Sequence, residues 1–244
     1  MKKIVYGISV TVALILTGCG STSTPGSQAA SLSSLNGNAS SAPKLIDGQK
    51  YALAYMWNEE KLAKDIYLAL NDIWPSRTFY NIATRGETQH EAAVEALVQR
   101  YDINITNLAD YEESYSEAEL RAFVPGKYAI PKIQDLYDAL YVKGVRSAQE
   151  AVEVGCMVEV TDVNDLNEHI GASEGVDDLV TTFEHLRSGS YSHYWAFDGV
   201  LKSMGVTDGC CSLGSDFCKT VEEYPSNSGG NGGNGGNGKK GGRR

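Results

Sequence analysis

The chain has 244 residues, of which 42% are hydrophobic, and this is enough for one domain with its own core but little for a second. Its formal net charge is -10, and its one basic cluster lies at the extreme C-terminus, within residues 239–244. Nucleic acid is therefore not expected as a partner, because an anionic phosphate backbone needs a basic surface.

The N-terminus has the pattern of an export signal. Two lysines precede the apolar run 4–16, which is too short to cross a membrane comfortably. The run ends in the letters L-T-G-C, which resemble a bacterial lipobox and imply that residues 1–18 are cleaved and that Cys19 carries lipid. An ordinary signal peptide and a retained membrane anchor are the alternatives. We expect an exported protein, lipid-anchored to the cell envelope at the outer membrane or the cell surface.

A flexible tether and a first helix follow. Residues 19–46 are rich in Ser, Gly, Ala, Asn and Pro, a composition typical of a tether. Residues 47–74 carry apolar side chains at the 3-4-3-4 spacing of a helix that buries one face. Glu60 is the one charged residue on this apolar stripe. Glu59 and Asp65 lie mostly off it and are expected on a solvated face.

A second helix is expected over residues 79–101, after an N-cap at Ser76 or Thr78. Near its middle, Glu87 and His90 stand three residues apart, so a helix places them side by side on one face. Apolar residues share that face. A carboxylate and an imidazole inside a core are costly unless they are neutralised, paired or bound to a metal.

A long connection follows the second helix. Residues 102–129 are acidic and irregular, apart from a short helix predicted over residues 116–123. Pro131 opens a further short helix over residues 133–142. A connection of this length is unusual between neighbouring helices, and it suits a bundle whose second and third main helices run parallel.

Two more long helices are expected, over residues 148–170 and 176–204. In the first of these, Glu159 is the single charge on the apolar stripe, and Asp162 lies one turn further on, at the edge of the stripe. In the second, His193 is the only imidazole on the stripe. The domain therefore spans residues 47–206, with four long helices.

The sequence changes character at residue 207, where a Cys-containing and Gly/Asn-rich tail over residues 207–244 is predicted to be disordered. Cys210 or Cys211 could form a disulfide with Cys218, which an exported protein permits. A thiolate metal site is the less favoured alternative. Cys156, in the third long helix, is expected to be a buried free thiol.

Each of the four apolar stripes is interrupted near its middle by residues that bind metals: Glu60, Glu87 with His90, Glu159, and His193. One such interruption would prove little, because a buried Glu is usually paired with a cation and a lone core His is usually satisfied. Four at comparable depth, with no Lys or Arg on the stripes, indicate a shared site. Oxygen and imidazole ligands together suit iron, manganese or zinc.

Several segments also resemble known families. E-K-L-A-K-D-I-Y, from Glu60, and E-T-Q-H, from Glu87, resemble the first two helices of ferritins and rubrerythrins. Blocks such as F-Y-N-I-A-T-R-G-E-T-Q-H, V-G-C-M-V-E-V-T-D-V-N-D-L and L-R-S-G-S-Y-S-H-Y-W-A-F resemble, in order, an uncharacterised ferritin-like family, domain of unknown function 2202. The resemblance covers residues 47–206. It implies an all-α ferritin-like four-helix bundle with a long crossover between the second and third helices. It also implies five metal ligands: Glu60, Glu87, His90, Glu159 and His193.

One departure from this pattern bears on the site. A symmetric di-iron site would have Glu one turn before His193, where this chain has Ser190. Asp162, or with less support Glu184, could supply the missing carboxylate. Otherwise the site is asymmetric or holds a single metal ion.

Other polar and sulfur-containing residues are weaker candidates. Tyr67 shares the face of Glu60, where it could hydrogen-bond a ligand or simply fill the core. His169 and His185 lie off the stripes and are expected at the surface. Met56 and Met204 are expected in the core.

The expected function is redox chemistry at a di-iron-type centre, namely Fe(II) oxidation with oxygen or peroxide, with manganese or zinc as alternative metals. The alternative is a metal-binding or buffering module of the cell envelope without turnover. A third possibility is a structural network of buried Glu and His with no metal. No residue is assigned a catalytic role, and a homodimer is left open.

Overall fold

The computed structural model describes residues 43–111 and 113–226. The predicted signal peptide with Cys19, the predicted tether up to residue 42, and the Gly/Asn-rich end from residue 227 lie outside the described residues. The described residues form helices and no strand, so the prediction of an all-α fold is confirmed for them. None of these helices combines the length and hydropathy that a membrane span requires.

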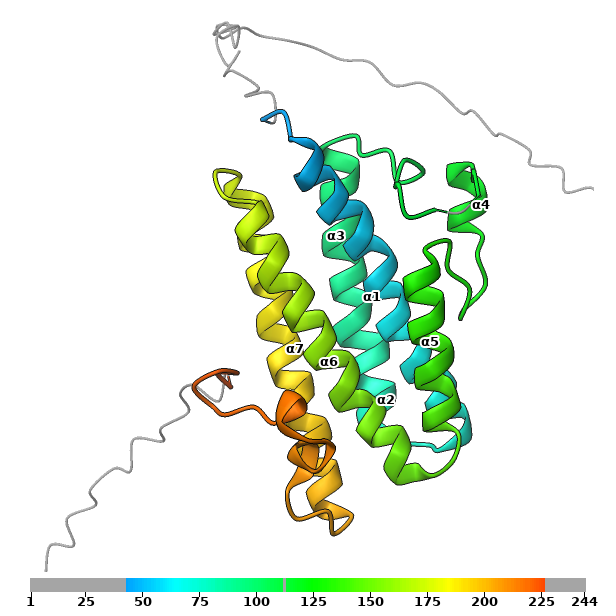
Figure 1. Cartoon of the computed structure of the whole chain (residues 1–244), viewed down its shortest axis with the longest axis vertical. Coiled ribbons are helices and arrows are strands. Elements are labelled where there is room, and N and C mark those ends of the chain that lie inside the picture. The colour runs from blue at the N-terminus through cyan, green and yellow to red at the C-terminus, as the bar shows by residue number, and fades with distance from the viewer. Residues whose placement is uncertain (1–42, 112, 227–244) are drawn as a thin grey trace, which may run out of the picture. The chain divides into compact units, whose positions relative to one another are not determined.

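Four long helical segments form the body of the domain (Figure 1). They are α1 (Asp47–Ile73), α3 (Thr88–Arg100), α6 (Ala148–Ala172) and α7 (Asp177–Ser203). Their contacts close a ring, because α1 packs on α3 and α6, and α7 packs on the same two helices. This arrangement lets one face of each helix point toward a common interior.

The connection between α3 and α6 holds α4 (Glu117–Arg121) and α5 (Pro131–Gly144). Figure 1 shows that α3 and α6 run in the same direction, as the length of the connection predicts. Pro131 lies at the start of α5, where its missing N–H costs no helical hydrogen bond. α5 packs against α1 and α6, so it covers a second side of both helices.

The predicted second helix is interrupted. α2 (Arg77–Asn81) is capped by the Ser76 hydroxyl, which accepts a hydrogen bond from the amide of Thr78. A π-helical turn, η1 (Ile82–Glu87), then leads into α3. Such turns add a residue to the helical repeat and are frequent at functional sites. This turn ends at Glu87, a predicted ligand.

Three predictions about exposure are wrong. Glu59 and Asp65 are buried rather than solvated, because α5 and the chain before it cover that side of α1. Asp65, for example, accepts hydrogen bonds from the Gly126 amide at 2.9 Å and the Tyr128 hydroxyl at 2.8 Å. His169 is also buried, among aromatic rings that include Tyr55.

Of three other predictions about burial, two are confirmed and one is wrong. Met56 is in the core as expected, but Met204 is 43% exposed, because α7 ends just before it. His185 is exposed as predicted.

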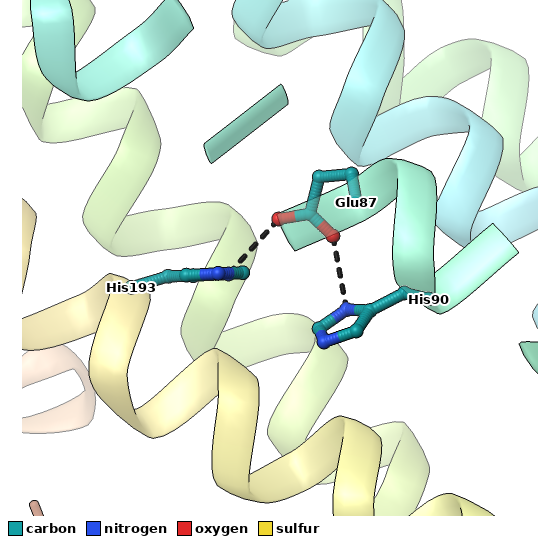
Figure 2. A group of neighbouring side chains, drawn as sticks. All are labelled: Glu87, His90 and His193. Atoms are coloured by element: carbon teal, nitrogen blue, oxygen red, sulfur yellow. Dashed lines mark ion pairs between the residues drawn. The ribbon is translucent and has the colours of Figure 1, made fainter. Parts of the chain in front are cut away.

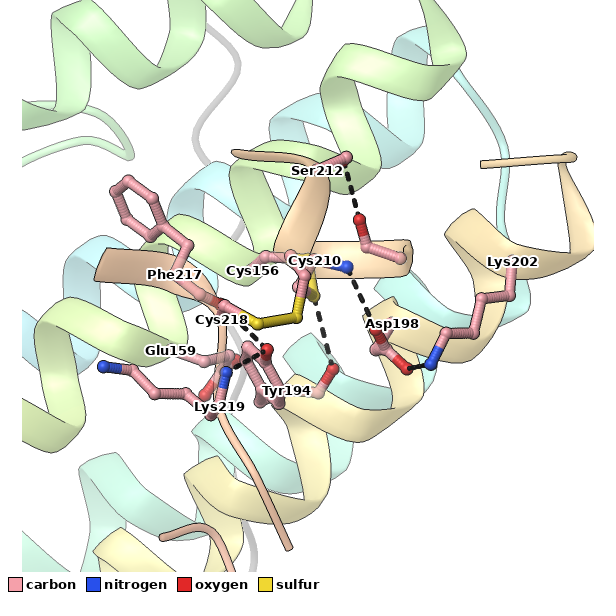
Figure 3. Close-up of a disulfide and its surroundings, with 12 residues drawn as sticks. Cys156, Glu159, Tyr194, Asp198, Lys202, Cys210, Ser212, Phe217, Cys218 and Lys219 are labelled. Atoms are coloured by element: carbon pink, nitrogen blue, oxygen red, sulfur yellow. Dashed lines mark hydrogen bonds and ion pairs between the residues drawn. A yellow bond between two sulfur atoms is a disulfide. The ribbon is translucent and has the colours of Figure 1, made fainter. Parts of the chain in front are cut away.

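The chain after α7 corrects two further predictions. Residues 207–226 are not a disordered tail: η2 (Gly209–Leu213) and η3 (Ser215–Phe217) are short 3-10 helices in contact with α6. Cys156 is buried but is not a free thiol, because it forms a disulfide with Cys210 (Figure 3). Cys211 pairs with Cys218, one of the two pairings left open. The Cys156–Cys210 disulfide ties this segment to α6, and the Cys211–Cys218 disulfide closes a loop within the segment.

Candidate metal centre

Glu87 stands between two histidines (Figure 2). Its Oε2 lies 3.1 Å from Nδ1 of His90, one turn further along the same helix. Its Oε1 lies 3.0 Å from Nδ1 of His193, which comes from α7. One carboxylate therefore faces two imidazoles, one with each oxygen, and one ligand atom from each of these three residues lies within 4.8 Å of the other two.

A second carboxylate flanks each histidine. Glu60 Oε2, from α1, is 3.2 Å from His90 Nδ1, and Glu159 Oε2, from α6, is 3.5 Å from His193 Nδ1. The side chains follow one another in the order Glu60, His90, Glu87, His193, Glu159. The structure thus brings together the five residues that the resemblance implies as metal ligands.

Burial and mutual charge set the protonation of these groups. Burial raises the pKa of Glu60 to about 7, against the opposing charge of His90. Burial also acts on Glu87, but the positive charges of His193 and His90 outweigh it and lower its pKa. Burial alone would lower the pKa of His193, yet Glu87 and Glu159 raise it to about 10. Without a cation other than these imidazoles, the cluster carries an excess of carboxylates.

The ligand atoms do not satisfy one another by hydrogen bonds. Glu60 Oε1, Glu87 Oε1, and Nδ1 of both histidines are buried and lack a hydrogen-bond partner, although each Nδ1 lies 3.0–3.5 Å from carboxylate oxygens. An imidazole N–H that served a structural pair would point along the line to its acceptor. Orphaned atoms that converge in this way fit a metal ion, which accepts lone pairs from all of them.

Neighbouring hydroxyl groups hold two of the carboxylates. The Tyr67 hydroxyl donates to Glu159 Oε1 at 2.5 Å, so this buried tyrosine does bond a predicted ligand. Ser190 donates to Asp162 Oδ2 at 2.6 Å. Glu184 is exposed and ion-paired with Arg187 at 3.8 Å, which excludes it as a substitute carboxylate. Asp162 is buried beside the centre, and the negative charges of Glu60 and Glu159 add to burial in raising its pKa.

Sequence reasoning missed two features near the centre. The first is Glu59, whose burial depends on the distant α5. The second is a pair of glycines, Gly86 and Gly189, each packed against an imidazole. A signal for them was present, because G-E-T-Q-H and G-S-Y-S-H both place a glycine four residues before a histidine.

Comparisons with known proteins agree on one family. The family model described as an uncharacterized protein domain (DUF2202) matches residues 49–216. The chain is 34% identical over 168 residues to the uncharacterized protein MJ0754 of Methanocaldococcus jannaschii, a match that covers 68% of this chain and 83% of the relative. It is also similar to the crystal structure of hypothetical protein MJ0754 from Methanococcus jannaschii, with a TM-score of 0.59 and 31% identity, over 75% of this chain and 92% of that chain.

Proposed function

The chain belongs to the DUF2202 family, and on that premise we propose that its buried Glu/His cluster is a ferritin-like di-iron centre that oxidises Fe(II) with oxygen or peroxide. The observation that carries this proposal is the position of Glu87, with one oxygen toward His90 and the other toward His193. In ferritin-like bundles, two helices each supply a Glu and the other two each supply a Glu-x-x-His motif, and these side chains together hold two metal ions. Here Glu87 would help to hold metal on the side of His90 and on the side of His193.

Each position would have its own outer ligands. His90 with Glu60 would hold one ion, and His193 with Glu159 the other. Imidazole with carboxylate suits iron, and manganese or zinc fit the same donors. Bound iron would supply one-electron redox chemistry. The role of the protein is to hold the carboxylates in place, and the hydrogen bond from Tyr67 to Glu159 serves that purpose.

Ser190 supports an alternative, a metal-binding module of the cell envelope that stores or buffers metal without turnover. At this position a symmetric centre would have a second bridging carboxylate, but the Ser190 hydroxyl bonds Asp162 instead. With fewer bridging oxygens, the two positions would differ in affinity. A centre with one weak position could bind metal well and oxidise it poorly.

The cysteines support the proposed export of this protein. Four of the five cysteines lie in the described residues, and all four are paired in two disulfides. Disulfides form and persist in oxidising compartments and are rare in the cytosol. Cys19 is the remaining cysteine, and the proposed lipid anchor would modify it.

Anaerobic titration of the purified protein with Fe(II), followed by air, tests the proposal. Two irons per chain and a new near-ultraviolet ferric band are expected. One metal ion, or binding without a spectral change, would favour the buffering module. Glu87→Ala should lose at least one iron and keep its helical circular dichroism, and the exposed Glu184→Ala serves as the control. Unchanged iron binding in Glu87→Ala would contradict both functions.

A further inference from the structure

The chain after α7 is bound to the two helices that carry Glu159 and His193. We call residues 207–224 the C-terminal strap, which contains η2 and η3. We propose that Tyr194 is a positioning residue for His193 and that the strap holds it in place, so that metal binding by Glu159 and His193 depends on the strap. This inference rests on the proposed function and deepens it, because it assigns to one of the two metal positions a support that the other lacks.

One strap residue, Cys210, is bonded to both helices. Its disulfide partner on α6, Cys156, stands three residues before Glu159, so the two share one face of that helix. Figure 3 shows Glu159 among the residues around a disulfide. The amide of Cys210 donates to Asp198 Oδ1 of α7 at 3.0 Å. The strap is thus attached to α6 one turn from a candidate ligand and to α7 at the same time.

The strap also covers one face of α7. Its partners there are spaced three, four and seven residues apart, as side chains on one helical face are: Tyr191, Tyr194, Trp195 and Asp198. The ring centroid of Tyr224 lies 4.6 Å from that of Tyr191 and 5.1 Å from that of Tyr194. The indole N–H of Trp195 donates to the Tyr224 carbonyl at 2.8 Å. These contacts flank His193 on both sides along the helix.

Tyr194 is the most firmly held of these partners, and it directly follows His193. Its side chain is fully buried, and its hydroxyl donates to the Phe217 carbonyl at 2.8 Å and accepts from the Lys219 amide at 3.1 Å. The ring is therefore fixed to the strap from a turn of α7 whose backbone also aims the His193 imidazole. His193 Nδ1 lies 3.5 Å from Glu159 Oε2. Because metal ligands must be held within about 0.5 Å of their working geometry, a small shift of this turn would weaken binding.

The other metal position draws on different helices. Glu60 and His90 come from α1 and α3. In the described part of the chain, the disulfide, hydrogen bonds and ring contacts that join the strap to long helices go to α6 and α7. Loss of these contacts should therefore weaken one metal position and spare the other, whereas a strap that only stabilised the fold would affect both alike.

Anaerobic Fe(II) titration of the whole protein tests the two positions one at a time. His90→Ala leaves the position of Glu159 and His193, and His193→Ala leaves the other. Tyr194→Phe keeps the ring and removes both hydrogen bonds, so it should weaken Fe(II) binding about tenfold in the His90→Ala background and leave it nearly unchanged in the His193→Ala background.

Two further variants complete the series. The Cys156→Ala/Cys210→Ala double variant should show the same selectivity as Tyr194→Phe, which carries the test by itself if the double variant fails to fold. The partly exposed Tyr141→Phe is the matched control and should bind as its background does.

A second measurement does not need metal. The chain has four histidines, so nuclear magnetic resonance of isotope-labelled histidine can follow each imidazole. In metal-free Tyr194→Phe the ring signals of His193 should shift, whereas those of His90 should stay. The inference is overturned if Tyr194→Phe leaves the His193 signals and Fe(II) binding unchanged, or weakens both metal positions alike. A wild type that binds no Fe(II) would contradict the proposed function alone, and the histidine spectra would still decide whether the strap positions His193.

Discussion

Gly86 and His193 are in such close contact that a Cβ atom on Gly86 would lie 2.4 Å from Nε2 of the imidazole. Gly189 stands in the same relation to His90, also at 2.4 Å from Nε2. Gly86 directly precedes Glu87 and makes room for His193. Gly189 directly precedes Ser190 and makes room for His90. Each histidine is thus positioned by the opposite segment.

The reciprocal contacts predict a crossed effect. Gly86→Ala should displace His193 and weaken Fe(II) binding at least tenfold at the proposed metal position shared with Glu159. Gly189→Ala should weaken Fe(II) binding at the proposed position that His90 shares with Glu60. The physical reason is steric, because a distance of 2.4 Å forces the ring to move. Fe(II) titration of each variant, alone and combined with His90→Ala or His193→Ala, measures the effect.

In that series, Gly86→Ala should cause no further loss of Fe(II) affinity in the His193→Ala variant, but it should cause a further loss in the His90→Ala variant. Gly199→Ala is the control, because a Cβ at Gly199 meets nothing within 4 Å. Wild-type affinity in both Gly86→Ala and Gly189→Ala would show that the imidazoles need no such space.

Tyr67→Phe should destabilise the metal-free protein. The change removes the donor to Glu159 Oε1 and leaves a buried carboxylate oxygen without its hydrogen bond. Loss of a buried partner of this kind costs about 1–3 kcal/mol. Urea denaturation followed by circular dichroism measures the free energy of unfolding. The partly exposed Tyr141→Phe should leave it nearly unchanged, and an equally small effect in Tyr67→Phe would mean that Glu159 finds another donor.

The two disulfides should differ in their contribution to stability. Cys156–Cys210 joins residues 54 positions apart, whereas Cys211–Cys218 joins residues 7 apart. On the chain-entropy account, the longer loop contributes about 4 kcal/mol and the shorter one about 2 kcal/mol. Denaturation of the Cys156→Ala/Cys210→Ala and Cys211→Ala/Cys218→Ala double variants compares them. A larger loss from the shorter loop would refute this account.

Acid should destabilise the protein partly through His169. Burial lowers the pKa of this imidazole, so the folded state keeps it neutral. Below about pH 6.5 the unfolded chain takes up a proton that the folded chain refuses, so stability falls as the pH falls, by at most about 1.4 kcal/mol per unit. Unfolding of metal-free protein between pH 7.5 and 5.5 should depend less on pH in His169→Gln than in the wild type. The exposed His185→Gln should keep the wild-type slope, and an identical slope in His169→Gln would exclude this role.

The sequence alone indicated the four long helices and the residues that interrupt their apolar stripes. Burial on one face of a helix is a local property, because the 3.6-residue repeat places Glu60 among apolar neighbours whatever the rest of the chain does. The same holds for Glu87 with His90 and for Glu159. The spacing of the candidate ligand residues was therefore readable without a structure.

Only the tertiary structure decided what depends on distant segments. Glu59 is buried because α5, some 70 residues further along the chain, covers it, and no local period encodes that contact. Cys156 pairs with Cys210 because the fold brings them together, which cysteine spacing cannot predict. The place of Glu87 between His90 and His193 likewise arises only where α3 meets α7, since packing of separate helices sets distances that a single helix does not contain.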